Sequence, residues 1–303
     1  MAETRRGFIV GAAAYAMWGV FPLYWTLLKP AGAIEILAHR VFWSLAVMAV
    51  LVVALRRVSQ FKEILSTPRT RIFIMVASVV IAVNWGAFIW GVNNGHVVET
   101  SLGYFINPLV TVMMGVVLLG ERLRRLQWVA MGIATVAVLG LTIEYGRPPW
   151  VALVLAFSFG TYGLAKKKAN AGAVESLALE TLLLAPIALG YLLFLGSQGT
   201  SSFGNAGTGH AALLVSTGIV TAIPLICFGA AATRVSMTTL GLLQYLAPTI
   251  QFVLGLVVFH EPMTAMRWVG FILVWVALAI FTFELVVNHR RRQLRLTAEA
   301  AAI

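Results

Sequence analysis

The sequence contains no aspartate, a single cysteine (Cys227), and charged side chains at only 11% of its 303 positions. Without aspartate there can be no aspartyl dyad, aspartate-based calcium loop or Walker B aspartate. One cysteine cannot form an internal disulfide, and its apolar surroundings indicate a packing residue. The P-loop pattern G-x-x-x-x-G-K-[ST] is also missing. Soluble domains carry about 25% charged residues, well above the 11% found here, and this chain is 60% hydrophobic. The composition therefore predicts a polytopic membrane protein.

Ten apolar stretches are long enough to cross a bilayer, which takes roughly 20 residues. The first five cover residues 7–28, 33–55, 72–93, 100–119 and 127–144, and the other five cover residues 150–167, 174–196, 211–231, 238–259 and 266–287. Short links that mostly contain proline or glycine separate them. We therefore expect ten transmembrane helices.

The chain also repeats itself at a shift of about 140 positions, which indicates a duplicated domain. Pro108, Gly115, Glu121 and Trp128 recur as Pro248, Gly255, Glu261 and Trp268. Each copy holds five predicted spans, an odd number, so the second copy must lie inverted in the bilayer. We predict an all-α integral membrane fold with two inverted five-helix repeats, residues 7–146 and 147–287, and a basic cytoplasmic tail at 288–303. Inverted repeats are typical of secondary transporters.

Lysine and arginine predict the orientation of the spans. With a cytoplasmic N-terminus, eighteen of the 22 basic residues fall on the cytoplasmic side, and three (Lys29, Arg147 and Arg267) fall outside. Cytoplasmic links carry such an excess, so both termini are expected in the cytoplasm. The same bias accounts for the net charge of +11 without a nucleic-acid partner.

Four strings carry a resemblance to a known family: GAAAYAMWG at 11–19, EILAHR at 35–40, SLGYFINPL at 101–109 and QYLAPT at 244–249. The chain resembles the drug/metabolite transporter superfamily with two EamA-type halves, and within it the RarD family of chloramphenicol-sensitivity proteins. The resemblance covers about residues 7 to 283. It implies a bacterial inner-membrane protein of ten helices that exports small metabolites or drugs.

Arg40 is the one basic residue that lies well inside a predicted span, away from its ends. By the helical rise of 1.5 Å per residue, it lies about 6 Å from the midpoint of that span. An arginine there costs at least about 2.5 kcal/mol on insertion. We expect Arg40 to face a watery cavity, where its guanidinium could hold a carboxylate or phosphate of the substrate. The alternative is a long side chain that extends to the outer interface.

Glu180 occupies the position in the second copy that matches Arg40. The inversion puts the two about 13 Å apart along the membrane normal, which argues against a direct ion pair. Because burial favours the neutral form of a carboxyl, Glu180 is the first candidate for proton coupling. His39 is the second, since histidine titrates near neutral pH. A histidine that only packs between helices is an equally open interpretation of His39.

Aromatic and amide side chains mark the rest of the expected substrate pocket. The predicted substrate-binding residues besides Arg40 are Trp85, Tyr104, Asn107, Gln244 and Tyr245, accompanied by Asn84 and Gln251. Each could instead form hydrogen bonds between helices. Taken together, on helices related by the repeat, they predict a shared pocket for a partly apolar, drug-sized ligand.

Four glutamates near span ends are interpreted as structural. Glu35 and Glu175 are repeat mates in the first turns of their helices, where a carboxylate complements the helix dipole. Glu121 and Glu261 end the fourth and ninth spans, where we expect them to cap the next helix or bridge to a link residue.

These features predict a secondary active exporter of small organic metabolites or drugs that works by alternating access, driven by a proton gradient or by exchange. The expected partners are a small-molecule substrate and the lipid bilayer, without nucleic acid, and the protein is expected as a monomer or a homodimer. No cofactor and no metal are expected. The alternative is a membrane-embedded enzyme that acts on lipids, although G-x-S-x-G and H-E-x-x-H are missing.

Overall fold

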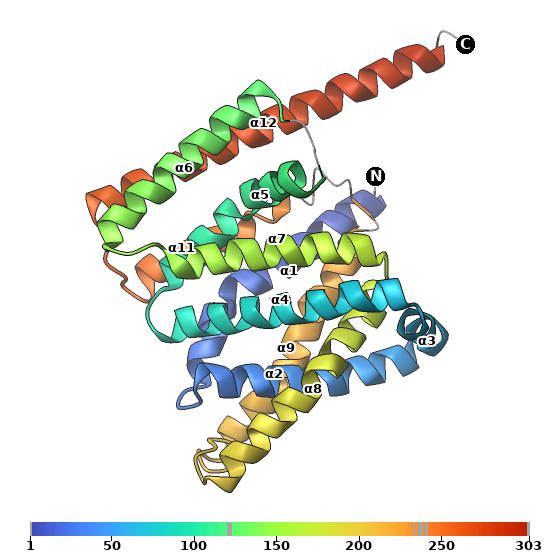
Figure 1. The fold of residues 1–303 in the computed structure, drawn as a ribbon, viewed down its shortest axis with the longest axis vertical. Coiled ribbons are helices and arrows are strands. Elements are labelled where there is room, and N and C mark those ends of the chain that lie inside the picture. The colour runs from blue at the N-terminus through green and yellow to red at the C-terminus, as the bar shows by residue number, and fades with distance from the viewer. Residues whose placement is uncertain (1, 120–122, 233, 236–238, 240–241, 302–303) are drawn as a thin grey trace.

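The computed structural model describes residues 2–119, 123–232, 234–235, 239 and 242–301, and the regular structure in them is helical (Figure 1). The helices before residue 147 are α1 (Ala2–Leu27), α2 (Ala33–Ala54), α3 (Val58–Ser66), α4 (Pro68–Asn93), α5 (Val97–Leu119) and α6 (Arg125–Tyr145). Those after it are α7 (Trp150–Ala169), α8 (Ala173–Ser197), α9 (Thr208–Ala232), α11 (Leu246–Val257) and α12 (Ala265–Ala301).

Eight of these helices are long and apolar enough to cross a membrane, and two shorter apolar segments, Trp150–Lys166 in α7 and Leu246–Val257 in α11, accompany them. Their outward faces carry apolar side chains: Val53, Ile143 and Ile187 are 67%, 78% and 74% exposed. Such apolar faces are stable against lipid, where a helix also satisfies its own backbone groups. The chain is therefore an all-helical, multi-pass integral membrane protein, as the sequence predicts.

The largest difference from the predicted spans lies in the stretch 238–259. Residues 242–243 are helical, a turn follows at Gln244 and Tyr245, and α11 begins only at Leu246. Pro248 explains where α11 begins, because proline lacks a backbone N–H and the first turn of a helix leaves its N–H groups unbonded anyway. Thr238 lies outside the described residues.

Two further features were not expected from the sequence. The nine-residue helix α3 occupies the basic link between α2 and α4. Helix α12 continues to Ala301 and so runs into the stretch predicted as a separate tail. One expected structural residue, Glu121, lies outside the described part of the chain.

Helices of the N-terminal half pack mainly on helices of the C-terminal half. Helix α4 lies along α7, α1 on α9 and α11, α2 on α8 and α9, α5 on α7 and α11, and α6 along α12. Figure 1 shows the α6–α12 pair at one end of the bundle and α2, α8 and α9 at the other. Small residues permit this close packing: a Cβ added to Gly103 of α5 would lie 2.8 Å from the carbonyl oxygen of Ala152 in α7. The two halves therefore share one interior.

Candidate functional site

Arg40 lies in that shared interior and is 4% exposed. Its Nε donates a hydrogen bond to Oγ1 of Thr221 on α9 at 3.0 Å. Its Cζ lies 3.9 Å from the ring centre of Trp85 on α4 and 5.0 Å from that of Trp25 on α1. Helices from both halves therefore surround the guanidinium, which does not extend to the outer interface.

The charge of Arg40 has no carboxylate partner among the described residues. The ion pairs within 4.0 Å join Arg57 to Glu175, Arg124 to Glu284, Arg147 and His96 to Glu99, and Lys166 to Glu180. The two indole faces and one hydroxyl compensate the charge only in part, since a cation–π contact contributes about 0.5–2 kcal/mol. A buried cation held this way keeps a strong attraction for an anion.

Three of the predicted pocket residues, Trp85, Tyr104 and Asn84, lie together near Arg40. Tyr104 of α5 donates its hydroxyl to Oδ1 of Asn84 at 3.1 Å, and Nδ2 of Asn84 donates to Oγ of Ser158 on α7 at 3.0 Å. Tyr104 lies within electrostatic range of Arg40. The chain Tyr104–Asn84–Ser158 thus connects α5, α4 and α7 beside the guanidinium.

The other predicted pocket residues have different neighbours. Asn107 accepts a 3.5 Å hydrogen bond from Thr111 on its own helix. Gln244 and Tyr245 lie in the turn before α11, where Tyr245 bonds to Gln244 and to Thr282 of α12. No hydrogen bond or ring contact among the described residues joins these side chains to Arg40, so the predicted residues do not form one pocket around the guanidinium.

Glu180 is fully buried and closely held. Its carboxylate accepts hydrogen bonds from Lys166 at 2.7 Å, from Ser176 at 2.8 Å and from Tyr162 at 3.1 Å. Lys166 comes from the end of α7, and its Nζ also donates to Ser176. Glu180 therefore pairs with lysine from its own half.

His39 lies on the same helix as Arg40, but its side chain has different neighbours. Its Nδ1 accepts a hydrogen bond from Nε1 of Trp43 at 3.3 Å, and its ring stacks on Phe203 with 4.9 Å between ring centres. Its Nε2 is buried without a hydrogen-bond partner. His39 thus packs under the link between α8 and α9.

The same link closes a cavity of about 500 Å³ lined by Pro30, Glu35, Tyr191, Ser201, Ser202 and Asn205, among others. Glu35 accepts hydrogen bonds from the backbone N–H of Ser202 at 2.7 Å and from Oγ of Ser201 at 3.2 Å. Its mate Glu175 pairs with Arg57 at 3.2 Å. Both glutamates therefore hold a link against a helix end.

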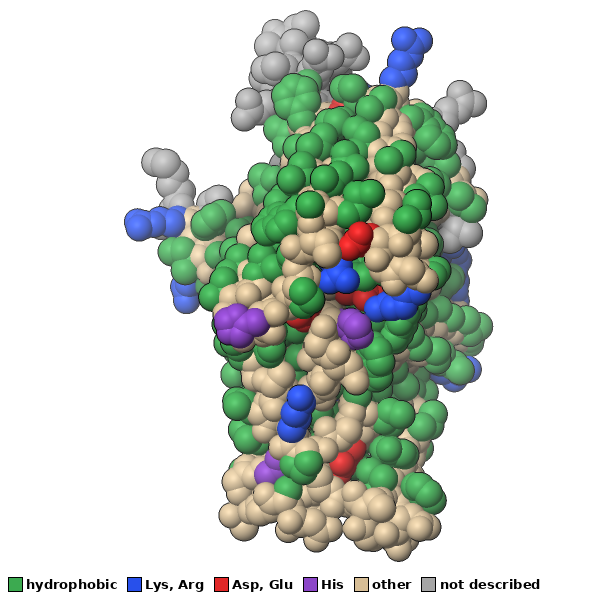
Figure 2. Space-filling model, turned by 90° about the vertical axis from the view of Figure 1, so that its left-hand side faces the viewer, with side chains coloured by type: hydrophobic (Ala, Val, Ile, Leu, Met, Phe, Trp, Pro, Cys, Tyr) green, Lys and Arg blue, Asp and Glu red, His purple; other side chains and the backbone are tan. Residues whose placement is uncertain are grey.

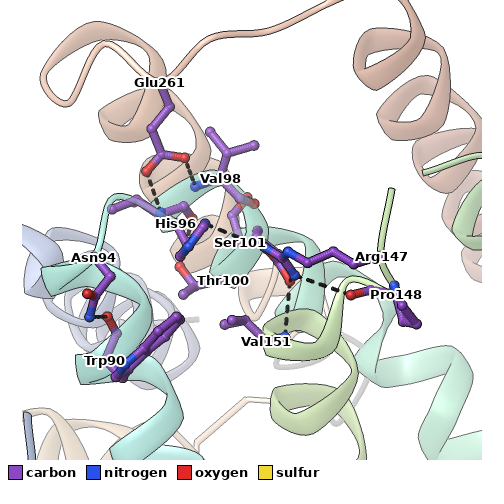
Figure 3. Close-up of polar contacts among 12 residues, drawn as sticks. Trp90, Asn94, His96, Val98, Thr100, Ser101, Arg147, Pro148, Val151 and Glu261 are labelled. Carbon is purple, nitrogen blue, oxygen red and sulfur yellow. Dashed lines mark hydrogen bonds and ion pairs between the residues drawn. The ribbon is translucent and has the colours of Figure 1, made fainter. Parts of the chain in front are cut away.

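Sequence reasoning missed a second polar cluster, drawn in Figure 3. Glu99, in the first turn of α5, is 2% exposed and accepts two hydrogen bonds from Arg147, at 2.9 and 3.3 Å, and one from the N–H of Val151 at 3.0 Å. The carboxylate raises the pKa of Arg147. A glutamate in the first turn of a helix was the available signal, but Arg147 lies 48 positions away.

Glu261 belongs to the same cluster and corrects an expectation. Among the described residues, its side chain neither caps the next helix nor bridges to a residue of its own link. Its two carboxylate oxygens instead accept hydrogen bonds from the backbone N–H groups of Val97 and Val98, which begin α5 in the other half (Figure 3). Burial raises the pKa of Glu261, and these two N–H groups oppose that shift. The glutamate thus joins the α11–α12 link to the N-terminus of α5.

Figure 2 views the side of the molecule that is on the left in Figure 1. Acidic, basic and histidine side chains gather midway along this face, and apolar side chains cover much of the surface above them. The lower end is mostly tan, the colour of the backbone and of side chains that are neither hydrophobic nor charged nor histidine. The links that follow α1, α4, α6, α8 and α11 all reach this side in Figure 1.

Comparison with known proteins agrees with this architecture. The model of the EamA-like transporter family matches residues 5–143 and again residues 148–283. Protein RarD of Streptomyces exfoliatus is 59% identical over 301 residues, covering 99% of this chain and 96% of the relative. Protein RarD of Escherichia coli (strain K12) is 44% identical and covers 95% of this chain and 98% of its own.

Two further matches extend the comparison. The uncharacterized transporter YojE of Bacillus subtilis (strain 168) is 44% identical over 93% of this chain and 95% of its own. A solved crystal structure shares the fold with a TM-score of 0.56 at 19% identity, over 90% of this chain and 96% of its own. Given these matches and the apolar, all-helical architecture, the chain belongs to the EamA-like transporter family and is a RarD-like membrane transporter.

Proposed function

We propose that the protein is a secondary active transporter that exports small organic metabolites or drugs across the bacterial inner membrane by alternating access. A proton gradient or exchange drives it. Two inverted five-helix repeats, residues 7–146 and 147–287, enclose the substrate between them, with both termini in the cytoplasm. The protein acts as a monomer or a homodimer in the bilayer, without nucleic acid.

The observation that carries this proposal is the correspondence in helix packing. If α1, α2, α4, α5 and α6 match α7, α8, α9, α11 and α12, the packing of α4 on α7 has its counterpart in α9 on α1. Likewise α5 on α7 corresponds to α11 on α1, and the pairs α2–α8, α5–α11 and α6–α12 correspond to themselves. A pseudo-two-fold axis in the membrane plane generates such a pattern, and transporters bind substrate near such an axis.

Two other observations support the inverted arrangement. The family model matches the chain twice, at residues 5–143 and 148–283. The N-terminal end of α1 and the C-terminal end of α12 lie on the same side of the bundle in Figure 1, as an even number of crossings requires. The excess of basic residues in the links on that side favours the cytoplasm.

Each group near the interior has a part in the proposed cycle. Arg40, Trp85 and Tyr104 bind the substrate, and Asn107, Gln244 and Tyr245 line its path. Glu180 exchanges a proton while Lys166 retains its charge, and His39 is the second candidate for that exchange.

The test begins with the growth medium of bacteria that express the protein or its Arg40→Gln variant. Compounds that accumulate only with the wild-type protein are then loaded into proteoliposomes with an imposed pH gradient. We expect gradient-dependent flux in the wild-type protein and its loss in Glu180→Gln. Equal flux with and without protein would contradict transport, and turnover of a lipid by the purified protein would favour the lipid-enzyme alternative.

One relative suggests a first probe. A protein of Pseudomonas aeruginosa that is 29% identical over 287 residues carries the name "Chloramphenicol-sensitive protein RarD". Chloramphenicol efflux from the same proteoliposomes is therefore a direct measurement to make before the substrate is identified.

A further inference from the structure

The hydrogen-bonding capacity of Arg40 is largely unused. A guanidinium has five N–H donors, and Arg40 uses the one on Nε, which bonds to Thr221. No described residue accepts a hydrogen bond from either of its terminal Nη groups. Since donors in the interior of a protein are normally paired, these four N–H groups mark a place for an acceptor that comes from outside the chain.

The described buried carboxylates near the bundle interior are engaged elsewhere. Glu180 holds Lys166, Glu99 holds Arg147, Glu175 holds Arg57, and Glu35 accepts hydrogen bonds from Ser201 and Ser202. An internal counterion for Arg40 would have to leave one of these partners. A ligand that carries its own negative charge meets no such competition.

The surroundings of the guanidinium also restrict the body of the ligand. Trp25 and Trp85 lie over it, Tyr24 packs edge-on against Trp25 with ring centres 5.0 Å apart, and Phe88 packs against Tyr104 at 5.7 Å. Flat aromatic walls pack well against flat apolar groups. A carboxylate presents two oxygens that match the guanidinium fork.

We infer that Arg40 binds the carboxylate of a small aromatic acid, and that this class of organic anion is the cargo of the site. The inference rests on the proposed transport function. A neutral amide of the same shape loses the charge of the carboxylate and turns a hydrogen-bond donor toward the guanidinium. The site therefore selects the acid over its amide.

Titration of intrinsic tryptophan fluorescence tests this inference, because Trp25 and Trp85 lie at the guanidinium. Purified full-length protein in detergent is titrated with benzoate and, separately, with benzamide, at constant ionic strength. We expect benzoate to change the fluorescence saturably in the millimolar range or below, and benzamide to bind at least about 10-fold more weakly.

Three variants locate the effect. Arg40→Gln is expected to weaken benzoate binding at least about 10-fold, and Arg40→Lys to weaken it less because the charge remains while the planar fork is lost. Lys62→Gln, which removes an exposed positive charge on α3, is expected to bind benzoate as the wild-type protein does. Should Arg40→Gln fail to fold, the ratio of benzoate to benzamide affinity in the wild-type protein decides instead. Equal affinity for the two compounds would then contradict the inference.

Absence of saturable benzoate binding, equal binding of benzamide, or unchanged benzoate binding in folded Arg40→Gln would each overturn the inference. The binding assay is independent of transport. Selective binding without flux would contradict the transport proposal alone, whereas flux without selectivity for the acid would contradict this inference alone.

Discussion

Arg40 and Glu180 occupy matching positions in the two repeats, yet their surroundings differ sharply. Glu180 receives three hydrogen bonds, including one from Lys166 at 2.7 Å, all from its own half. Arg40 lies against two indole faces and donates to one hydroxyl, which comes from the other half. One half thus holds a compensated buried charge, and the other holds an uncompensated one.

The difference separates a charge that is already paired within the protein from one that is available to a ligand. A buried ion pair offsets its own desolvation, and removal of one partner leaves the other charge costly. A cation that lacks a carboxylate has no such dependence, so its loss removes the attraction for an anion without leaving a buried charge behind. We therefore expect opposite effects on the free energy of unfolding when each charge is removed.

The largest expected effect is on transport by Arg40→Gln. Flux of the identified cargo through proteoliposomes should fall at least about 100-fold, because the group that holds its charge is gone. The free energy of unfolding should stay equal or rise, since a costly buried charge is removed. Flux and unfolding in detergent are measured on the same preparation; wild-type flux would contradict the assignment.

The next effect is on stability, at the compensated site. Glu180→Gln leaves Lys166 charged beside a neutral side chain and should lower the free energy of unfolding by about 2–3 kcal/mol. The estimate is at the low end because the Lys166 side chain is 22% exposed. The double variant Glu180→Gln with Lys166→Met should recover most of the loss. If the double variant were no more stable than the single one, the pair would not be the cause.

A smaller effect is expected where Arg40 meets the other half. Thr221→Val removes the acceptor for Nε of Arg40 and should cost about 2 kcal/mol, as for hydrogen bonds to charged groups. Thr181→Val is the matched control, because its buried hydroxyl bonds only to carbonyl oxygens of its own helix among the described residues. Equal losses in the two variants, measured by unfolding in detergent, would show that the contact with Arg40 adds nothing.

The smallest effect concerns the neutral bond beside Arg40. Tyr104→Phe removes the hydroxyl that donates to Asn84 at 3.1 Å and should cost about 1 kcal/mol. Tyr162→Phe, which removes a bond to the charged Glu180, should cost more. The reverse order in unfolding measurements would mean that Glu180 is not the charged partner described here.

The sequence contains the signals for the spans and for Arg40, because apolar length and an isolated charge are local properties. It also contains the repeat. It does not contain the partners of Glu261, since the N–H groups of Val97 and Val98 lie 164 and 163 positions away. The partner of Glu180 was hidden for another reason: Lys166 belongs to a run of three lysines that indicated a cytoplasmic link, although its long side chain reaches back into the bundle.

The division of the predicted pocket has a similar cause. Polar residues on helices related by a repeat need not face one point, because each helix turns its own face to its neighbours. Trp85 and Tyr104 turn toward Arg40, whereas Tyr245 lies in a turn and packs near α12. Rotation about the helix axis depends on tertiary packing that a single sequence does not show.

The transport proposal depends on the inverted arrangement of the two halves, and cysteine labelling tests that arrangement most directly. In a Cys227→Ala background, Ser66→Cys and Asn205→Cys are treated in intact cells with a membrane-impermeant maleimide. The inverted arrangement predicts that Asn205→Cys is labelled at once and Ser66→Cys only after the membrane is opened. Labelling of both positions from the same side would contradict it.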